Sequence, residues 1–258
     1  MMADMTSTPS TLPVRVLGSR DALGEAAGRD IAGAIRTAVA ENGSARVIFA
    51  AAPSQSETLA TLATAPGIDW SRVDAFHMDE YVGLSEDAPE RFAKWLRRYL
   101  FDRLPFRSVN LLIPGAEPES EAARYAGLLA EAPVDVVVLG IGVNGHIAFN
   151  DPPVADFDDP LLAKVVELDE DCRQQQVDDD CFARIEDVPH KAITLTVPAL
   201  LAGRRLFCVV PGALKAAAVR ATLAEPVSTD WPSTVLRTHP NCTLYLEPES
   251  AALLEQVA

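Results

Sequence analysis

Basic residues are scarce in this sequence of 258 residues. It contains 22 Lys and Arg against 37 Asp and Glu, so its formal net charge at pH 7 is −15. Nucleic acids and anionic membranes require basic surfaces, and we therefore expect neither as a partner. The charge does not exclude a small phosphorylated ligand, because a local cluster of N–H donors is enough to bind a phosphate.

Cysteine is also scarce, and long hydrophobic runs are absent. The four cysteines, Cys172, Cys181, Cys208 and Cys242, are dispersed, form no C-x-x-C motif and have no zinc-like spacing to histidine. This pattern predicts reduced thiols, no metal site and a cytoplasmic location. No stretch of about 18 apolar residues is present, so we expect no membrane span.

Length and composition favour a globular chain. Hydrophobic residues make up 48% of the 258, enough for one large α/β domain or two small ones. Residues 1–11 are rich in Ser, Thr and Pro and lack the basic start and apolar core of a signal peptide, which predicts a flexible tail. No linker or internal repeat divides residues 12–258, and we expect them to form a single domain.

Short apolar runs alternate with helical patterns along the chain. The predicted strands are 14–17, 46–51, 73–77, 109–113, 134–139, 164–168, 191–196, 206–210 and 243–246. The predicted helices are 20–41, a segment ending at 62, 89–104, 118–130, the polar segment 169–180, one following 211, 231–238 and 249–256. This alternation predicts a doubly wound α/β fold, with a mainly parallel sheet flanked by helices on both faces.

The most informative segment is 134–153, where a buried strand pattern ends in glycines. Three glycines between 140 and 145 follow the apolar run 134–139, and His146 and Asp151 come next. Glycine allows a sharp turn and a close ligand approach, and histidine transfers protons near neutral pH. Because ligands bind at the carboxyl ends of strands in open α/β sheets, this segment predicts the edge of an active site.

The same glycines spell G-x-G-x-x-G, which also occurs at dinucleotide sites. A dinucleotide site requires a helix that runs on from the third glycine, and Pro152 and Pro153 forbid a long helix here. A nicotinamide or flavin site is therefore disfavoured. A tight turn with an incidental histidine remains as the structural alternative.

Two segments offer groups that suit a phosphate. Residues 52–57 read APSQSE between a predicted strand and a predicted helix, so Ser54 and Ser56 either bind an anion or cap the helix. Lys215 falls in the first turn of another predicted helix. The helix dipole repels a cation there unless an anion lies beside it, although a solvent-facing lysine is equally consistent with the sequence.

Two adjacent carboxylates, Asp79 and Glu80, follow the predicted strand 73–77. Such a pair at the end of a buried strand is unusual unless something uses it, so both residues are functional candidates. A solvated turn is the alternative.

Four segments together resemble one family. They read FHMDEYVGL at 76–84, LGIGVNGHIAFNDP at 139–152, VPHKAITLTV at 188–197 and PGALKAAAV at 211–219. In this order they make the chain similar, over about 14–254, to the glucosamine-6-phosphate deaminase/isomerase family, which is related to the 6-phosphogluconolactonases. MDEYVGL and GHIAFN are the most specific of these motifs.

The resemblance implies a modified Rossmann fold. It also implies conversion of an amino-sugar 6-phosphate to a ketose 6-phosphate and ammonia, without metal or nucleotide cofactor. Asp79 matches the residue that moves a proton between C1 and C2, His146 matches the ring-opening histidine, and Glu80 matches a supporting neighbour. The substrate-binding set that the resemblance implies is Ser54, Gln55, Ser56, Glu80, Gly145, Arg173 and Lys215.

The sequence departs from the family pattern beside His146. Asn144 stands where many deaminases have Asp, and Asp151 stands where they have Glu; both are expected to orient His146. Asn144 supplies no charge, and we expect this to cost about 1–2 kcal/mol of imidazolium stabilisation. The family's phosphate-clamping arginine aligns with Gln176, and Arg173 is the expected substitute.

Three functions remain open. The first converts glucosamine 6-phosphate and water, or the galacto epimer, to the ketose phosphate and ammonia. The second is a 6-phosphogluconolactonase-type hydrolase, which needs no base at C2 and therefore no Asp79. The third is a non-catalytic sugar-phosphate-binding protein, which Asn144 and Gln176 favour. A sugar phosphate is the expected small-molecule partner, and a homo-oligomer is neither required nor excluded.

Overall fold

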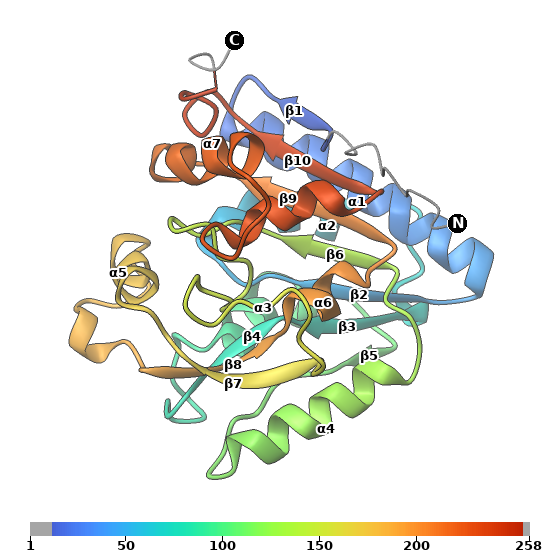
Figure 1. Cartoon of the computed structure of the whole chain (residues 1–258). Helices are drawn as coiled ribbons and strands as arrows, with labels where there is room; N and C mark the ends of the chain where they lie inside the picture. Colours follow the sequence, from blue (N-terminus) through green and yellow to red (C-terminus); the bar gives the residue numbers. More distant parts are fainter. Residues whose placement is uncertain (1–11, 255–258) are drawn as a thin grey trace, which may run out of the picture.

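Figure 1 shows the computed structural model, in which residues 12–254 are described. The predicted tail at 1–11 lies outside the described residues. A seven-stranded sheet forms the centre, and every neighbouring pair of strands in it is parallel. In spatial order its strands are β1 (Val14–Val16), β10 (Cys242–Leu246), β9 (Arg205–Val210), β6 (Val136–Leu139), β2 (Ala45–Phe49), β3 (Val73–His77) and β5 (Ser108–Val109).

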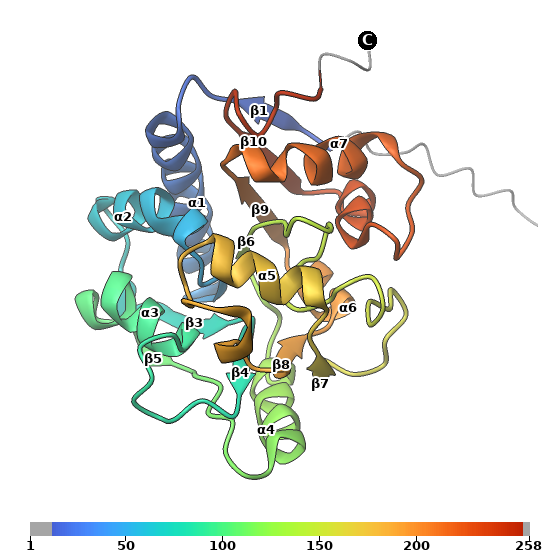
Figure 2. The ribbon, with the colours of Figure 1, turned by 90° about the vertical axis from the view of Figure 1, so that its left-hand side faces the viewer.

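Helices cover both faces of this sheet, as the sequence predicted (Figure 2). Alternate side chains of β2 enter different cores, because successive residues of a strand point to opposite faces. Val47 and Phe49 pack on one side and Ile48 on the other. The first core is completed by α1 (Arg20–Asn42), α2 (Ser56–Thr64) and α3 (Phe92–Tyr99). The second is completed by α4 (Pro118–Ala130), α6 (Val197–Leu201) and α7 (Ala216–Ala224).

A second, antiparallel sheet of three strands was not predicted. Its order is β4 (Asp79–Val82), β8 (Lys191–Leu195) and β7 (Ala163–Glu167). Only Met78 separates β3 from β4, so the chain passes directly from the parallel sheet into the antiparallel one. Asp79 and Glu80 therefore lie on a strand rather than in a loop. Aspartate and glutamate are depleted in strands, which explains why composition did not reveal this one.

The predicted strand 109–113 is wrong in its extent, since β5 ends at Val109. Beyond it the backbone bonds to side chains instead of a neighbouring strand. Leu112 N–H donates to His77 Nε2 at 2.8 Å, and Ile113 N–H donates to Glu121 Oε1 at 2.7 Å. These contacts satisfy the backbone without extending the sheet.

The predicted C-terminal helix is also wrong for its described part, because residues 249–254 form turns. The Glu247 carboxylate accepts hydrogen bonds from Glu249 N–H at 2.8 Å and from Ser250 N–H at 3.0 Å. The same carboxylate accepts a bond from Gly212 N–H at 2.9 Å. It thereby ties this turn to the loop that follows β9.

The remaining helices agree with the sequence in place but not always in length. The predicted helix 89–104 is divided into α3 and the short 3₁₀ helix η3 (Phe101–Arg103). The segment 231–238 forms a 3₁₀ helix, η6 (Pro232–Thr238). The polar helix is present as α5 (Glu170–Asp178), which lies beside the carboxyl ends of the parallel strands (Figures 1 and 2).

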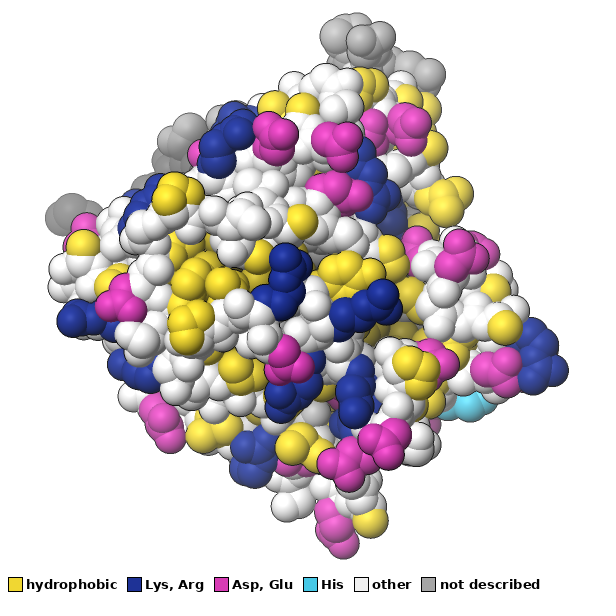
Figure 3. Space-filling model, turned by 180° about the vertical axis from the view of Figure 1, so that it is seen from behind, with side chains coloured by type: hydrophobic (Ala, Val, Ile, Leu, Met, Phe, Trp, Pro, Cys, Tyr) yellow, Lys and Arg dark blue, Asp and Glu magenta, His cyan; other side chains and the backbone are white. Residues whose placement is uncertain are grey.

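One face of the molecule carries both signs of charge rather than a patch of one sign. On the face seen in Figure 3, Lys and Arg side chains are interspersed with Asp and Glu, and hydrophobic side chains lie among them. Among residues 12–254 we find no helix with the length and apolar character that a membrane crossing requires. The four cysteines are free in the structure, and Cys181 is the one that is not fully buried.

The contact between α1 and α2 yields a test of the fold. A Cβ atom added at Gly24 would lie 2.4 Å from Glu57 Cβ and 2.8 Å from its carbonyl carbon. We expect Gly24→Ala to lower the free energy of unfolding by about 1–3 kcal/mol, because the helices must move apart. Gly33 is the control in the same helix, where the nearest atom is 3.8 Å away. Gly33→Ala should raise stability by up to about 1 kcal/mol through helix propensity. Urea denaturation measures both, and equal effects would contradict this packing.

Candidate active site

A cavity of about 320 Å³ opens at the carboxyl edge of the parallel sheet. Successive strands deliver its polar groups, as expected for an open α/β sheet. Its polar and glycine lining includes Ser54 and Gln55 after β2, Asp79 after β3, Gly140, Gly142 and His146 after β6, and Lys215 after β9. The helix α5 and the residues after it contribute Gln175, Gln176, Asp179, Asp180 and Cys181.

Two glycines shape the loop that carries His146. The imidazole ring lies directly against Gly142, where an added Cβ would be 2.2 Å from two ring atoms. Gly145 has φ +83°, in the left-handed region that glycine adopts readily. Gly145 itself faces Trp231 and Ser233 rather than the cavity, so it shapes the loop instead of lining the site.

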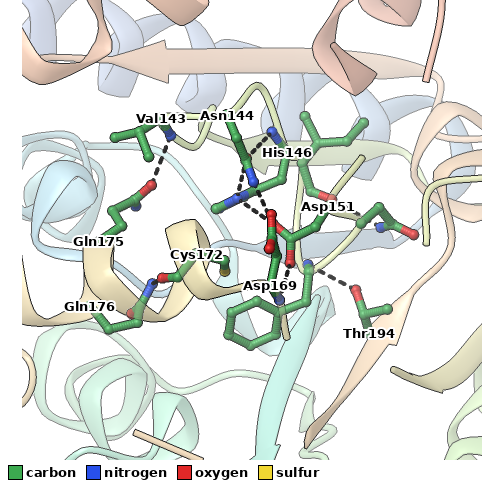
Figure 4. Close-up of polar contacts among 12 residues, drawn as sticks. Val143, Asn144, His146, Asp151, Asp169, Cys172, Gln175, Gln176 and Thr194 are labelled. Atoms are coloured by element: carbon green, nitrogen blue, oxygen red, sulfur yellow. Dashed lines mark hydrogen bonds and ion pairs between the residues drawn. The ribbon is translucent and has the colours of Figure 1, made fainter. Parts of the chain in front are cut away.

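His146 is oriented through one ring nitrogen (Figure 4). Its Nδ1 lies 2.8 Å from Asn144 Oδ1 and 2.9 Å from Asp151 Oδ1. Asn144 Nδ2 donates to the same Asp151 oxygen at 3.0 Å, which fixes the amide with its oxygen toward the ring. Both neighbours of Nδ1 are acceptors, so Nδ1 carries the hydrogen and Nε2 of the neutral ring keeps its lone pair for a ligand.

Asp151 is ionised despite being completely buried. Burial acts to raise its pKa, but the hydrogen bond and charge of His146 and the bond from Asn144 outweigh burial and leave the pKa lowered. The buried carboxylate therefore retains the charge that stabilises an imidazolium on His146. Neither Asn144 nor Asp151 lines the cavity, and both act on it through the histidine.

Asp79 and Glu80 have different environments, because successive strand residues face opposite sides. Asp79 lines the cavity and is only 7% exposed. Burial, and then the charge of Glu80, raises the pKa of Asp79 well above its usual value. Such a carboxyl group exchanges protons more readily near neutral pH than an exposed one.

Glu80 is not brought to the cavity. Its carboxylate accepts hydrogen bonds from Phe92 N–H at 3.1 Å and Ala93 N–H at 3.0 Å, at the first turn of α3. It also accepts from Tyr81 N–H at 3.0 Å and lies 3.6 Å from the Arg91 guanidinium. Glu80 therefore caps α3 and fixes that helix to β4, next to Asp79.

Lys215 extends into the cavity from the 3₁₀ helix η5 (Ala213–Lys215) and is 6% exposed. Burial lowers the pKa of Lys215, and the negative charge of Asp179 is the largest effect opposing it. The lysine ion pairs found among the described residues involve Lys94, Lys164 and Lys191, not Lys215. A buried ammonium without a partner is costly, so this end of the cavity suits an anion.

Only part of the predicted phosphate loop lines the cavity. Ser54 and Gln55 line the cavity within η1 (Pro53–Gln55). Gln55 Nε2 donates to Val209 O at 3.1 Å and thereby joins this loop to β9. Ser56 begins α2 and does not line the cavity.

Arg173 is not brought to the site. Its guanidinium donates to Ile185 O at 2.6 Å and to Val188 O at 3.1 Å, so it fastens α5 to the following turn. Gln176 does line the cavity, but its amide oxygen accepts from Tyr81 O–H at 2.7 Å. Among the described lining residues, Lys215 is therefore the one Lys or Arg available to an anion.

Sequence reasoning missed the role of Gln175. Its Oε1 accepts a hydrogen bond from Val143 N–H at 2.8 Å, which joins α5 to the glycine loop (Figure 4). It also missed the apolar wall of Phe92, Trp95 and Phe149. The available signal was α5 itself, a short helix rich in glutamine whose polar side chains were unexplained.

One set of residues has the donor types for a metal ion. Ligand atoms of His146, Asp151 and Cys172 lie within 4.8 Å of one another, and all three residues are buried. Imidazole, carboxylate and thiolate suit zinc. However, His146 Nδ1 and Asp151 already bind each other, and burial raises the pKa of the Cys172 thiol well above its usual value. The residues present therefore fit a hydrogen-bonded cluster better than a metal centre.

A family model described as glucosamine-6-phosphate isomerases/6-phosphogluconolactonase matches residues 18–245. A glucosamine-6-phosphate deaminase of Exiguobacterium sp. is 39% identical over 188 residues, covering 72% of this chain and 71% of the relative. One from Listeria innocua is 34% identical over 216 residues, covering 83% and 89%.

Solved structures give the same result for the fold. A monomeric glucosamine-6-phosphate deaminase superposes with a TM-score of 0.85 at 28% identity, covering 94% of this chain and 100% of its own. A 6-phosphogluconolactonase from Shewanella baltica reaches 0.75 at 20% identity, covering 93% and 100%. The second likeness concerns the fold alone.

Fold and site together define an α/β enzyme in which Asp79, His146 and Lys215 line one cavity at the carboxyl edge of the parallel sheet. The chain belongs to the family of glucosamine-6-phosphate isomerases and 6-phosphogluconolactonases.

The opposite pKa shifts of Asp79 and Asp151 predict opposite effects on stability. The folded state raises the pKa of Asp79, so ionised Asp79 destabilises it at neutral pH, and Asp79→Asn should raise the free energy of unfolding. The folded state lowers the pKa of Asp151, so Asp151→Asn should reduce it.

The gain in Asp79→Asn should shrink as the pH falls toward the unfolded aspartate pKa of about 3.9, because Asp79 is then protonated in both states. The loss in Asp151→Asn should persist down to about this pH and fade only below it, because the folded-state pKa of Asp151 is lower still. Urea denaturation across this range measures them. A loss of stability in both variants would contradict the assigned environments.

Proposed function

We propose that this protein converts glucosamine 6-phosphate and water, or the galacto epimer, to a ketose 6-phosphate and ammonia. The observation that carries this proposal is the meeting of three groups in one cavity. Asp79 has a raised pKa, His146 is oriented through Nδ1, and Lys215 is buried without a partner. The names of the relatives support the same activity.

Ring opening is assigned to His146. Its free Nε2 accepts the proton of the C1 hydroxyl and returns a proton to the ring oxygen, which leaves the open-chain aldehyde. The imidazolium formed between these transfers is stabilised by ionised Asp151 through Nδ1. Asn144 orients the ring but adds no charge.

The isomerisation is assigned to Asp79. Its carboxylate removes the proton from C2, giving an enol amine, and the carboxyl group then delivers a proton to C1. The resulting C2 iminium adds water and releases ammonia, which gives the ketose. The raised pKa of Asp79 suits both halves of this transfer, because the group must hold the proton between them.

Phosphate is assigned to the end of the cavity formed by Lys215 and Ser54. The free cysteines suit a reducing compartment, and we propose a cytoplasmic location.

A lactonase is the second candidate, because lactonases share the fold. The charge of the cavity argues against it. Four carboxylates, of Asp79, Glu90, Asp179 and Asp180, line the same space as the single Lys215. A lactone phosphate carries only negative charge, whereas an amino-sugar phosphate also carries an ammonium group that suits this excess of carboxylates.

Purified protein should release ammonia from glucosamine 6-phosphate or galactosamine 6-phosphate with no added cofactor. Treatment with EDTA should leave the rate unchanged, because the hydrogen-bonded cluster at His146 needs no metal. An ammonia-coupled assay measures both, and hydrolysis of 6-phosphogluconolactone is the parallel control. No ammonia release combined with lactone hydrolysis would establish the lactonase instead.

Lys215→Ala should raise KM roughly 10- to 100-fold, since a charged hydrogen bond is worth about 1.5–3 kcal/mol. The matched control is Lys191→Ala on β8, where the lysine is exposed and lies outside the cavity lining. Steady-state ammonia release measures both variants. An unchanged KM for Lys215→Ala would place the phosphate elsewhere.

A further inference from the structure

The anion end of the cavity has an unusual charge balance. Lys215 faces a space that Asp179 and Asp180 also line, and Gln176 is engaged with Tyr81. One ammonium therefore shares this cavity with two carboxylates, and the charge of Asp179 has the larger effect on it. A doubly ionised phosphate would be attracted by the first and repelled by the others.

Asp179 is held in place by a chain of hydrogen bonds. Its Oδ2 accepts from Gln175 Nε2 at 3.2 Å, and Gln175 Oε1 accepts from Val143 N–H at 2.8 Å. The backbone N–H of Asp179 donates to Gln175 O at 2.8 Å. The loop that carries His146 thus orients this carboxylate. Among the described residues, Oδ1 of Asp179 accepts no hydrogen bond and is available to a ligand.

An ionised carboxylate can only accept hydrogen bonds. Asp179 therefore favours a ligand that brings a donor and disfavours one that brings only negative oxygens. A phosphate ester has a second pKa of about 6, so near this pH it retains one P–O–H group. A sulfate ester retains no proton in this range.

We propose that Asp179 is a specificity-determining residue that accepts a hydrogen bond from the P–O–H group of a singly protonated phosphate held by Lys215. The cavity then selects phosphate esters over sulfate esters of the same sugar. The inference rests on the proposed function in placing the 6-phosphate beside Lys215.

Because the cavity would select the singly protonated phosphate, its affinity for phosphate should depend on pH. Lowering the pH toward 6 increases the singly protonated phosphate and tightens its binding. Each pH unit well above the phosphate pKa should weaken binding about tenfold, because the protonated fraction falls by that factor. Binding of sulfate should not follow this pattern.

The test is calorimetric titration of methyl phosphate and of methyl sulfate into the full chain between pH 6 and 8, because the doubly ionised phosphate ester keeps no P–O–H group. The wild type should bind phosphate at least tenfold more tightly than sulfate at pH 6. Asp179→Asn has the same shape but supplies an amide N–H, which can donate to an oxygen of either anion. The variant should therefore bind the phosphate and the sulfate within about threefold of each other. The matched control is Asp178→Asn, which changes the charge equally at an exposed neighbour that bonds Gln174 and does not line the cavity.

Three results would overturn the inference: equal binding of both anions by the wild type, equal strengthening of both by Asp179→Asn, or no phosphate binding at pH 6. An equal gain for both anions would indicate simple charge repulsion. Turnover is measured separately with glucosamine 6-phosphate and glucosamine 6-sulfate. If the wild type released no ammonia from glucosamine 6-phosphate but still bound phosphate more tightly than sulfate, the proposed function would be refuted and the role of Asp179 would stand.

Discussion

The site depends on one buried contact, that between the Asp151 carboxylate and His146 Nδ1 at 2.9 Å. A completely buried carboxylate is costly unless donors surround it. His146 and Asn144 supply those donors, and in return the carboxylate fixes which ring nitrogen carries the hydrogen. Gly142 completes the arrangement, because only a residue without Cβ leaves room for the ring at this position. The same contact therefore orients the His146 ring and stabilises the local fold.

The two sheets explain how a carboxyl group with a raised pKa reaches the same cavity. The chain leaves β3 at the carboxyl edge of the parallel sheet and enters β4 one residue later. Asp79 faces the cavity, and Glu80 on the opposite side caps α3. Burial raises the pKa of both carboxyl groups, and the nearby charge of Glu80 raises that of Asp79 further.

Much of the fold followed from local pattern. The apolar run before Gly140 predicted a buried strand, and the strand-loop order placed Asp79, His146 and Lys215 at one edge. Contacts between distant segments could not be predicted in this way. Arg173 is engaged by the carbonyls of Ile185 and Val188, and the strand 109–113 is shortened by bonds to His77 and Glu121. Such side-chain-to-backbone bonds leave no periodic signal in the sequence.

The proposed ring opening requires that His146 carries its hydrogen on Nδ1 and presents Nε2 to the substrate. Nitrogen-15 NMR of the protein labelled in histidine tests this directly, since protonated and unprotonated ring nitrogens have well-separated shifts. We expect neutral His146 to be the Nδ1–H tautomer, and Asp151→Asn to weaken this preference. A resting Nε2–H tautomer in the wild type would contradict it, because no lone pair would then remain to accept the C1 hydroxyl proton.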